Sequence, residues 1–330
     1  MYSVFDRAVA CFKALATGDA IGKQTETLAH HDVRRWYPEG VRGFHGTPGE
    51  VIPRYAGNAN REWRIGETTD DTEQTLAVAR AVLSSGGVSH PAVGRELLRC
   101  RKSVHPGVRS IWTFQQIGDP KRIATEGSGC GAAMRVSPVG ILYPPERLDD
   151  LLRGAYQSSI PTHGANAAIS AAAAVAGAIS GALAGKTPAE VLPLATRCAR
   201  MAEAFVSGPG ERNGPTMARW IEKTHADLAA RATLDAAEMA ETHFPDRPET
   251  KVPLAIGLAL TAKSAERTIL LAANVGGDSD SVASIGGAIA AALWPDTVNE
   301  DWFAVVEAVN RDDIVAVARA LAERRASGED

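Results

Sequence analysis

Cysteine is scarce in this chain, and the few cysteines present lie far apart. They are Cys11, Cys100, Cys130 and Cys198, and no two of them form a C-x-x-C pair. This spacing argues against a zinc knuckle and against a dense disulfide framework. We therefore expect reduced thiols, most of them in the protein core.

An excess of positive charge is also missing. The 35 lysines and arginines are outnumbered by 39 aspartates and glutamates, which gives a net charge of −4. Without a basic face, neither nucleic acid nor an anionic membrane is the expected partner. The first residues contain no basic segment followed by an apolar run, so we expect no signal peptide and a cytoplasmic protein.

Convincing strand-like alternation is absent, whereas helix-like periodicity recurs along the chain, which predicts an all-α protein. The segment at about 31–65 lacks sustained periodicity and is predicted to be a long loop, either a functional cover over a pocket or a packed irregular connection. The polar stretch at about 206–253 is predicted to be a peripheral helical insertion. Residues 166–185 carry no charge and have the length of a membrane span, but their small side chains favour a buried helix.

An acidic turn at Gly276–Ser281 precedes an apolar helix predicted from about Val282 to Leu293. The turn combines two glycines with Asp278, Asp280 and two serines. Carboxylates and hydroxyls concentrated in this way are typical of a metal site.

A second acidic turn, Thr68–Thr72, has the same layout and opens a helix that stops at Gly86-Gly87. One interpretation is a capping box, because Asp70 is followed three residues later by Glu73. A cap needs only one acceptor, however, and this turn offers two adjacent carboxylates and three threonines. The alternative interpretation is that the two acidic turns meet and share metal ions.

The ligands that the two turns offer are all oxygens, which suit hard cations such as Mg²⁺ or Mn²⁺, whereas zinc would prefer histidine and cysteine. They are Thr69, Asp70, Asp71, Asp278, Asp280 and Ser281. Four clustered carboxylates would repel one another, and two divalent cations would neutralise them. Two such ions can hold vicinal hydroxyls and lower the pKa of a shared water, which is hydrolase chemistry.

Two further segments are candidates for substrate contacts. In Glu126–Arg135, three glycines alternate with small residues, so that backbone amides could approach a phosphate or a ribose. The segment lacks the Gly-Lys-Ser/Thr ending of a Walker loop, and a purely structural turn remains an alternative. His163 precedes an alanine-rich helix, where it could contact a ligand or be an ordinary hydrogen-bonded histidine.

Five segments, in this order, resemble the ADP-ribosylglycohydrolase family: Gly18-Asp19-Ala20-Ile21-Gly22 with Glu26, Thr69–Thr72, Gly131–Arg135, Thr162-His163 and Gly276–Ser281. The resemblance implies an all-α fold of orthogonally packed helices, formed by a single domain over residues 1–330. It also implies a cleft with a binuclear magnesium or manganese centre. The implied reaction is hydrolysis at the anomeric ribose carbon of an ADP-ribosyl group.

The resemblance also implies roles for individual residues. The metal ligands would be Thr69, Asp70, Asp71, Asp278, Asp280 and Ser281. The catalytic residues would be Glu26, Asp71 and Asp278, with Glu26 beside the centre either as a metal ligand or as an acid/base group. The ribose and diphosphate would be held by Ser128, Gly129, Cys130, Gly131, Ala132 and Met134, and His163 would line the pocket. Asp19 is interpreted as structural.

Two residues depart from the pattern of the resembled family. Ser281 stands where threonine is common, which keeps an oxygen ligand, and Cys130 stands where asparagine is common, which could alter substrate choice. The leading hypothesis is release of ADP-ribose from a modified acceptor, namely a protein side chain. The alternatives are hydrolysis of another riboside or small ADP-ribose conjugate, and a catalytically inactive, crystallin-like ligand-binding protein.

Overall fold

All the regular structure that the computed structural model describes, over residues 2–206 and 216–328, is helical, which confirms the predicted all-α class. One isolated antiparallel bridge joins Val51 and Arg64. The helices of the first half are α1 (Val4–Gly22), α2 (His30–Trp36), η1 (Pro53–Tyr55), α3 (Asp70–Ser85), α4 (His90–Leu97), α5 (Arg109–Ile117), α6 (Gly131–Met134), α7 (Ser137–Leu142), η2 (Pro145–Arg147) and α8 (Leu148–Ser159). Those of the second half are α9 (Asn166–Leu183), α10 (Pro188–Val206), α11 (Met217–Ala229), α12 (Ala236–His243), α13 (Pro248–Thr261), α14 (Ala265–Val275), α15 (Ser279–Leu293), η3 (Pro295–Thr297), α16 (Glu300–Asn310) and α17 (Ile314–Ser327).

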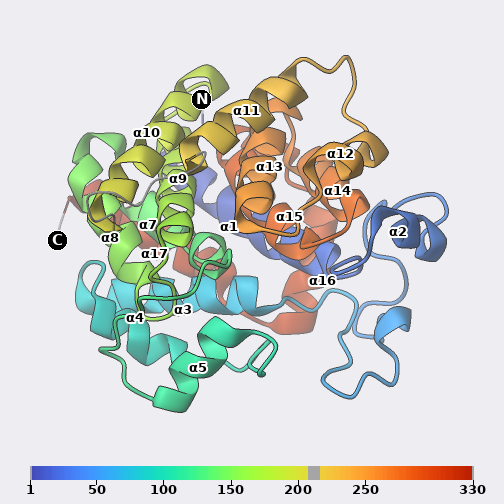
Figure 1. The fold of residues 1–330 in the computed structure, drawn as a ribbon, viewed down its shortest axis with the longest axis horizontal. Coiled ribbons are helices and arrows are strands. Elements are labelled where there is room, and N and C mark those ends of the chain that lie inside the picture. The colour runs from blue at the N-terminus through green and yellow to red at the C-terminus, as the bar shows by residue number, and fades with distance from the viewer. Residues whose placement is uncertain (1, 207–215, 329–330) are drawn as a thin grey trace.

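Helices α1 and α15 lie side by side at the centre of the molecule, although they come from opposite ends of the chain (Figure 1). Their backbones touch because glycine occupies the contact points of α1. A Cβ atom at Gly18 would lie 2.3 Å from the carbonyl oxygen of Ala283, and one at Gly22 would lie 2.5 Å from the Cα of Asp280. This close approach brings the segment after α1 next to the acidic turn that opens α15.

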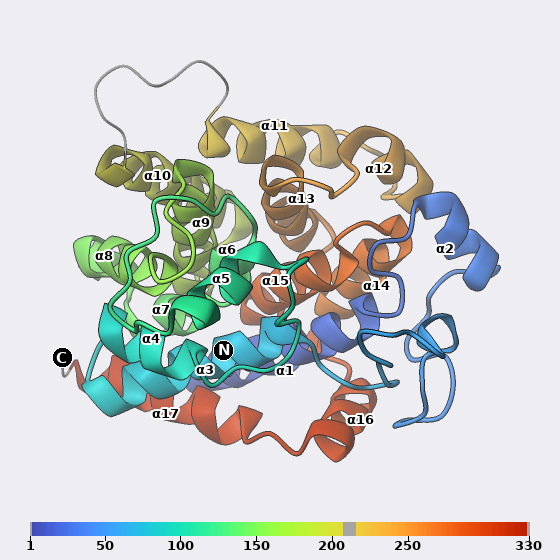
Figure 2. The same cartoon turned by 60° about the horizontal axis from the view of Figure 1, so that its bottom comes forward.

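The other helices surround this central pair. Helix α9 lies in the core, with 89% of its length buried, as predicted for residues 166–185. Helix α10 packs along α9, and α13 and α14 pack against α15. Seen from the direction of Figure 2, α11 and α12 form an outer layer beside α13 and α14, while α16 and α17 cover the opposite side.

The two segments predicted to be irregular or peripheral contain more order than expected. The 31–65 segment includes most of α2 and all of η1, and Ile52, Tyr55, Trp63 and Ile65 form a small hydrophobic cluster of their own. We call residues 51–65 the flap. In the 206–253 segment, residues 207–215 lie outside the described part of the chain. Helices α11 and α12 form an outer layer there, but α13 begins inside the segment, at Pro248, and is largely buried.

Candidate metal centre

Helix α3 begins at the first acidic turn, and its cap differs from the capping box considered above. The N-cap is Thr69, whose Oγ1 accepts a hydrogen bond from the backbone N–H of Asp71 at 3.3 Å. Glu73 instead accepts hydrogen bonds from the backbone N–H groups of Arg101 and Lys102. The capping-box interpretation is therefore wrong, because the threonine hydroxyl caps the helix and leaves the carboxylates of Asp70 and Asp71 available for other contacts.

The carboxylate of Asp19 holds this helix end in place. It accepts hydrogen bonds from the backbone N–H groups of Thr69 and Thr72 and from the Thr72 hydroxyl, the last at 2.6 Å. Asp19 is fully buried, and a carboxylate at a helix N-terminus is favoured by the helix dipole. These contacts agree with the structural role that the sequence indicated for Asp19.

Helix α15 begins at Ser279, three residues before the predicted start at Val282. Asp278 is the N-cap residue but makes no side-chain capping hydrogen bond, and Ser279 donates a hydrogen bond to the carbonyl oxygen of Gly22 at 2.9 Å. The prediction began too late because it relied on the apolar pattern, whereas the first turn of this helix is polar. Asp280 and Ser281 therefore belong to that turn, and both are buried.

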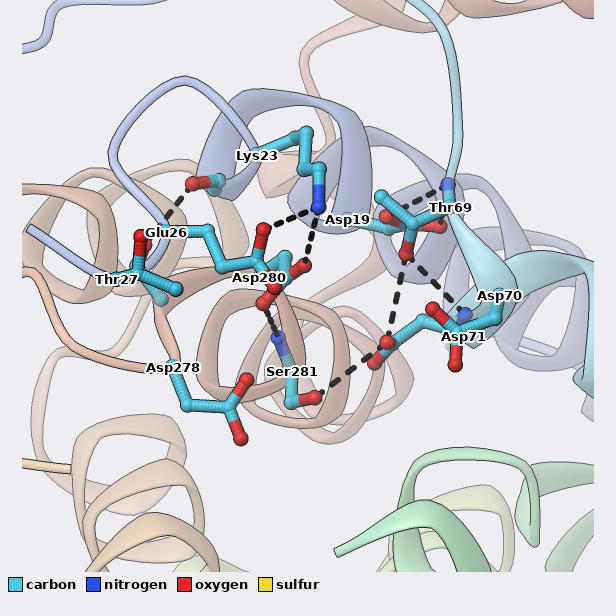
Figure 3. A network of polar contacts seen from close by, with 12 residues as sticks. Asp19, Lys23, Glu26, Thr27, Thr69, Asp70, Asp71, Asp278, Asp280 and Ser281 are labelled. Carbon is cyan, nitrogen blue, oxygen red and sulfur yellow. Dashed lines mark hydrogen bonds and ion pairs between the residues drawn. The ribbon is translucent and has the colours of Figure 1, made fainter. Parts of the chain in front are cut away.

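The two acidic turns meet, as predicted. The Ser281 hydroxyl donates a hydrogen bond to Asp71 Oδ2 at 3.4 Å, across the space between α15 and α3 (Figure 3). Glu26, Asp278 and Asp280 each place a carboxylate oxygen within 4.8 Å of the other two. The remaining oxygen of Asp71, Oδ1, is buried and has no hydrogen-bond partner. An unsatisfied buried carboxylate oxygen beside this all-oxygen donor set fits a hard divalent cation.

The carboxylates of this cluster have strongly perturbed proton affinities. Burial raises the pKa of Asp70 to about 6, and it raises the pKa of Asp71 and Asp280 well above the ordinary range. Neighbouring carboxylates add to the shift, chiefly Asp19 for Asp71 and Glu26 for Asp280. Positive charge placed among these groups would stabilise their ionised forms.

Two lysines that the sequence interpretation missed reach into the cluster. The Lys23 ammonium forms an ion pair with Glu26 and lies 3.8 Å from Asp280 Oδ2, and the Lys23 side chain is only 5% exposed. The Lys251 ammonium lies 2.5 Å from Asp278 Oδ2. Burial raises the pKa of Asp278, but the charge of Lys251 and the side-chain hydrogen bonds to this carboxylate together outweigh burial, and the net pKa is lowered. Lys23 lies within the Gly18–Glu26 segment, so its position in the sequence could have indicated a place near the site. Lys251, at the start of α13, lies near no motif that could have done so.

A cavity of about 920 Å³ opens beside the cluster. The predicted site residues in its wall are Glu26, Asp70, Asp71, Gly129, Cys130, Gly131, Met134, His163, Asp278, Asp280 and Ser281. Three predicted residues are not among its lining residues. Ser128 is exposed, Ala132 is fully buried, and Thr69 contacts the site through Asp71. The flap contributes Tyr55 and Trp63, which the sequence did not identify as site residues.

The glycine-rich segment and His163 are packed together. A Cβ atom at Gly131 would lie 2.8 Å from Cε1 of the His163 ring, so glycine at this position makes room for the histidine. Burial, together with the charge of Arg135, lowers the pKa of His163 to about 3, which keeps the imidazole neutral. Its Nδ1 lies 2.7 Å from the Thr162 hydroxyl, which orients the ring in the cavity wall.

Cys130 lies between the glycine-rich segment and the acidic turn of α15. Its thiol donates hydrogen bonds to Asp278 Oδ2 at 3.1 Å and to the Ser281 hydroxyl at 3.6 Å. Burial, followed by the charge of Asp278, raises the pKa of the thiol well above its ordinary value, so the proton stays on sulfur. All four cysteines are free and buried, which agrees with the expected core thiols.

The fold and this site define an all-helical protein with a carboxylate-rich cavity built where helix ends meet. The sequence matches the model of the ADP-ribosylglycohydrolase family over residues 1–330, and the chain belongs to that family.

The chain is also similar to individual proteins. An uncharacterized protein of Archaeoglobus fulgidus is 30% identical, over 84% of this chain and 85% of its own length. The ADP-ribosyl-[dinitrogen reductase] glycohydrolase of Rhodospirillum rubrum is also 30% identical, over 42% of this chain and 45% of its own length. Among solved structures, a chain of an ADP-ribosylglycohydrolase-related protein complex superposes with a TM-score of 0.72 at 25% identity, covering 98% of this chain and 100% of that one.

Proposed function

We propose that this protein is a divalent-cation-dependent glycosidase that releases ADP-ribose from a modified protein or small molecule, by hydrolysis at the anomeric ribose carbon. Membership of the ADP-ribosylglycohydrolase family supports ADP-ribosyl hydrolase activity in general. The observation that carries the finer proposal is the convergence of carboxylates from the end of α1 and the starts of α3 and α15 on one cavity. The glycine-rich segment and His163 form another part of the same wall.

The oxygens of the two acidic turns would hold Mg²⁺ or Mn²⁺ in this proposal. The residues are those named from the sequence: Thr69, Asp70, Asp71, Asp278, Asp280 and Ser281. The unpartnered Oδ1 of Asp71 supports this assignment, because a cation would satisfy it. Bound divalent cations would lower the pKa of a water and orient the ribose hydroxyls.

Proton transfer, positioning of Asp278 and substrate contact are assigned in this proposal to the protein's own side chains. Glu26 is partly buried, and its Oε2 accepts a hydrogen bond from the Tyr55 hydroxyl at 3.1 Å, so the flap holds this carboxylate at the edge of the cluster. From there Glu26 would accept a proton from the attacking water. The Lys251 ammonium and the Cys130 thiol both contact Oδ2 of Asp278 and so hold its carboxylate in place. The neutral His163 would contact substrate by hydrogen bonding rather than by charge.

The test is a product assay over a panel of substrates. The protein is incubated with Mg²⁺ or Mn²⁺ and with ADP-ribosylated proteins, ADP-ribosylated nucleic acids and small ADP-ribose conjugates, with a chelator-treated sample as the control. We expect cation-dependent release of free ADP-ribose from at least one member. If no member is cleaved while ADP-ribose and cation together raise the melting temperature, the protein is a ligand-binding protein. Cleavage of other ribosides alone would favour the alternative hydrolase.

Replacement of Cys130 by asparagine is expected to change substrate preference more than cation binding. An asparagine amide can still donate a hydrogen bond to Asp278, but it is larger and more polar than the thiol in the cavity wall. We expect relative kcat/KM values across the panel to change by about tenfold, with Mn²⁺ affinity nearly unchanged. Cys198→Ser, at a buried cysteine that does not line the cavity, is the control. Unchanged relative rates in Cys130→Asn would contradict the prediction.

A further inference from the structure

Lys23 is an unusual component of a site built to hold cations, because its own ammonium is already buried there. It forms an ion pair with Glu26 and approaches Asp280 Oδ2 (Figure 3). The flap holds it from the other side, with the ammonium 4.4 Å from the centre of the Trp63 ring and 5.6 Å from that of Tyr55. Such contacts with aromatic faces stabilise a desolvated ammonium. Lys23 is therefore a fixed part of the cluster.

The two halves of the cluster consequently differ in charge balance. On the side of α15, Lys23 partly neutralises Glu26 and Asp280, and Lys251 partly neutralises Asp278. On the side of α3, neither Asp70 nor Asp71 forms an ion pair with any described residue, and Asp71 Oδ1 has no hydrogen-bond partner. Among the described carboxylates of the cluster, those of the α3 half are therefore the ones without an ion pair, although the charge of Lys23 also lowers the pKa of Asp70.

We propose that Lys23 makes the two cation positions of this protein unequal. The half around Asp70 and Asp71 binds one divalent cation tightly, and the half around Glu26 and Asp280 binds a second cation weakly, in competition with the Lys23 ammonium. This inference rests on the cation requirement of the proposed function and adds that the second cation is the exchangeable one.

The physical reason is electrostatic and steric. A divalent cation held by Glu26 and Asp280 would be repelled by an ammonium bonded to the same carboxylates, and the repulsion is strong in a poorly solvated site. To make way, Lys23 would have to leave both the carboxylate and the rings of Trp63 and Tyr55, and a buried charge without partners is costly. A cation bound by Asp70 and Asp71 would displace no such group.

The experiment is a titration of the metal-free protein with Mn²⁺, in which the signal of free Mn²⁺ is followed by electron paramagnetic resonance. For the natural sequence we expect one tight and one weak binding step. In Lys23→Met we expect the second step to tighten by about tenfold or more, while the first changes much less. Lys23→Arg keeps the positive charge and should keep the second step weak.

Lys13→Met is the matched control, because Lys13 also pairs with a carboxylate, that of Glu300, and also faces an aromatic ring, that of Phe303 at 5.0 Å. Lys13 lies outside the cavity wall, and its replacement by methionine removes the same charge, so both binding steps should be unchanged.

Two equally tight steps in the natural protein would overturn the proposal, as would an unchanged second step in folded Lys23→Met. The natural protein alone supplies the first of these tests even if Lys23→Met does not fold. Complete absence of Mn²⁺ binding would overturn the inference together with the cation requirement, and the product assay then tests the hydrolase activity separately.

Discussion

Asp278→Ala is expected to abolish ADP-ribose release and, in the same variant, to reduce sharply the thermal stabilisation that Mg²⁺ or Mn²⁺ gives to the protein. Asp278 contributes a carboxylate oxygen to the group that it forms with Glu26 and Asp280. Removing it takes a ligand from the proposed centre and leaves the Lys251 ammonium without its partner. A cation at about 100 times its Kd stabilises a folded protein by about 2.7 kcal/mol, and a weakened site loses most of that gain.

The measurement is a pair of assays on each variant: product release, and melting temperature with cation or with chelator. Asp313→Ala is the matched control, because Asp313 is also an N-cap residue whose side chain makes no capping hydrogen bond, and it lies outside the cavity wall. The double variant Asp278→Ala with Lys251→Met removes the unpaired ammonium as well, and it should recover basal stability without recovering activity. Normal turnover by folded Asp278→Ala would refute the proposed centre.

Gly22→Ala is expected to destabilise the fold by about 3 kcal/mol and to weaken cation binding. The added methyl group would lie 2.5 Å from the Cα of Asp280 and 2.5 Å from the carbonyl oxygen of Ser279, and backbone atoms cannot give way as a flexible side chain can. The helices must therefore separate at the point where Glu26 meets Asp280. Chemical denaturation measures the stability, and Mn²⁺ titration measures the binding.

Gly181→Ala in α9 provides the control for this substitution. Gly181 is also a buried helical glycine, but the nearest atom to its added Cβ would be the flexible end of Leu194, at 3.0 Å. Alanine is the better helix former, so this variant should be close to neutral in stability. If Gly22→Ala is as stable as Gly181→Ala, backbone contact between α1 and α15 does not position the site.

The acidic turns show how far local sequence determined the site. Pairs of aspartates with hydroxyl neighbours at two helix starts were recognisable without the fold, and the prediction that the two turns meet is confirmed by the contact between Ser281 and Asp71. Carboxylate and hydroxyl oxygens suit hard cations, so a preference for such cations can be predicted from residue type alone. The capping of α3 could not be predicted from the sequence, because Thr69 and Asp70 are both residue types that cap helices. Only the orientation of the side chains shows that Thr69 is the N-cap.

Residues distant in sequence and without a local signature could be placed only by tertiary structure. Lys251 lies near the start of α13, before the apolar part of that helix, and Trp63 lies in a segment without periodicity, yet packing brings both to the cavity. His163 and Gly131 were named from the sequence, but their contact was not, and only the fold shows that the glycine makes room for the histidine ring.

The sequence by itself determined the helical class, the family resemblance and the oxygen-rich composition of the two acidic turns, because these depend on residue type and local spacing. The tertiary structure decided which charges share the site. The glycines of α1 let two backbones touch, and this contact places the buried ammonium of Lys23 among the carboxylates. Electrostatic energy depends on distance through space and on burial, and neither can be obtained from local spacing along the chain.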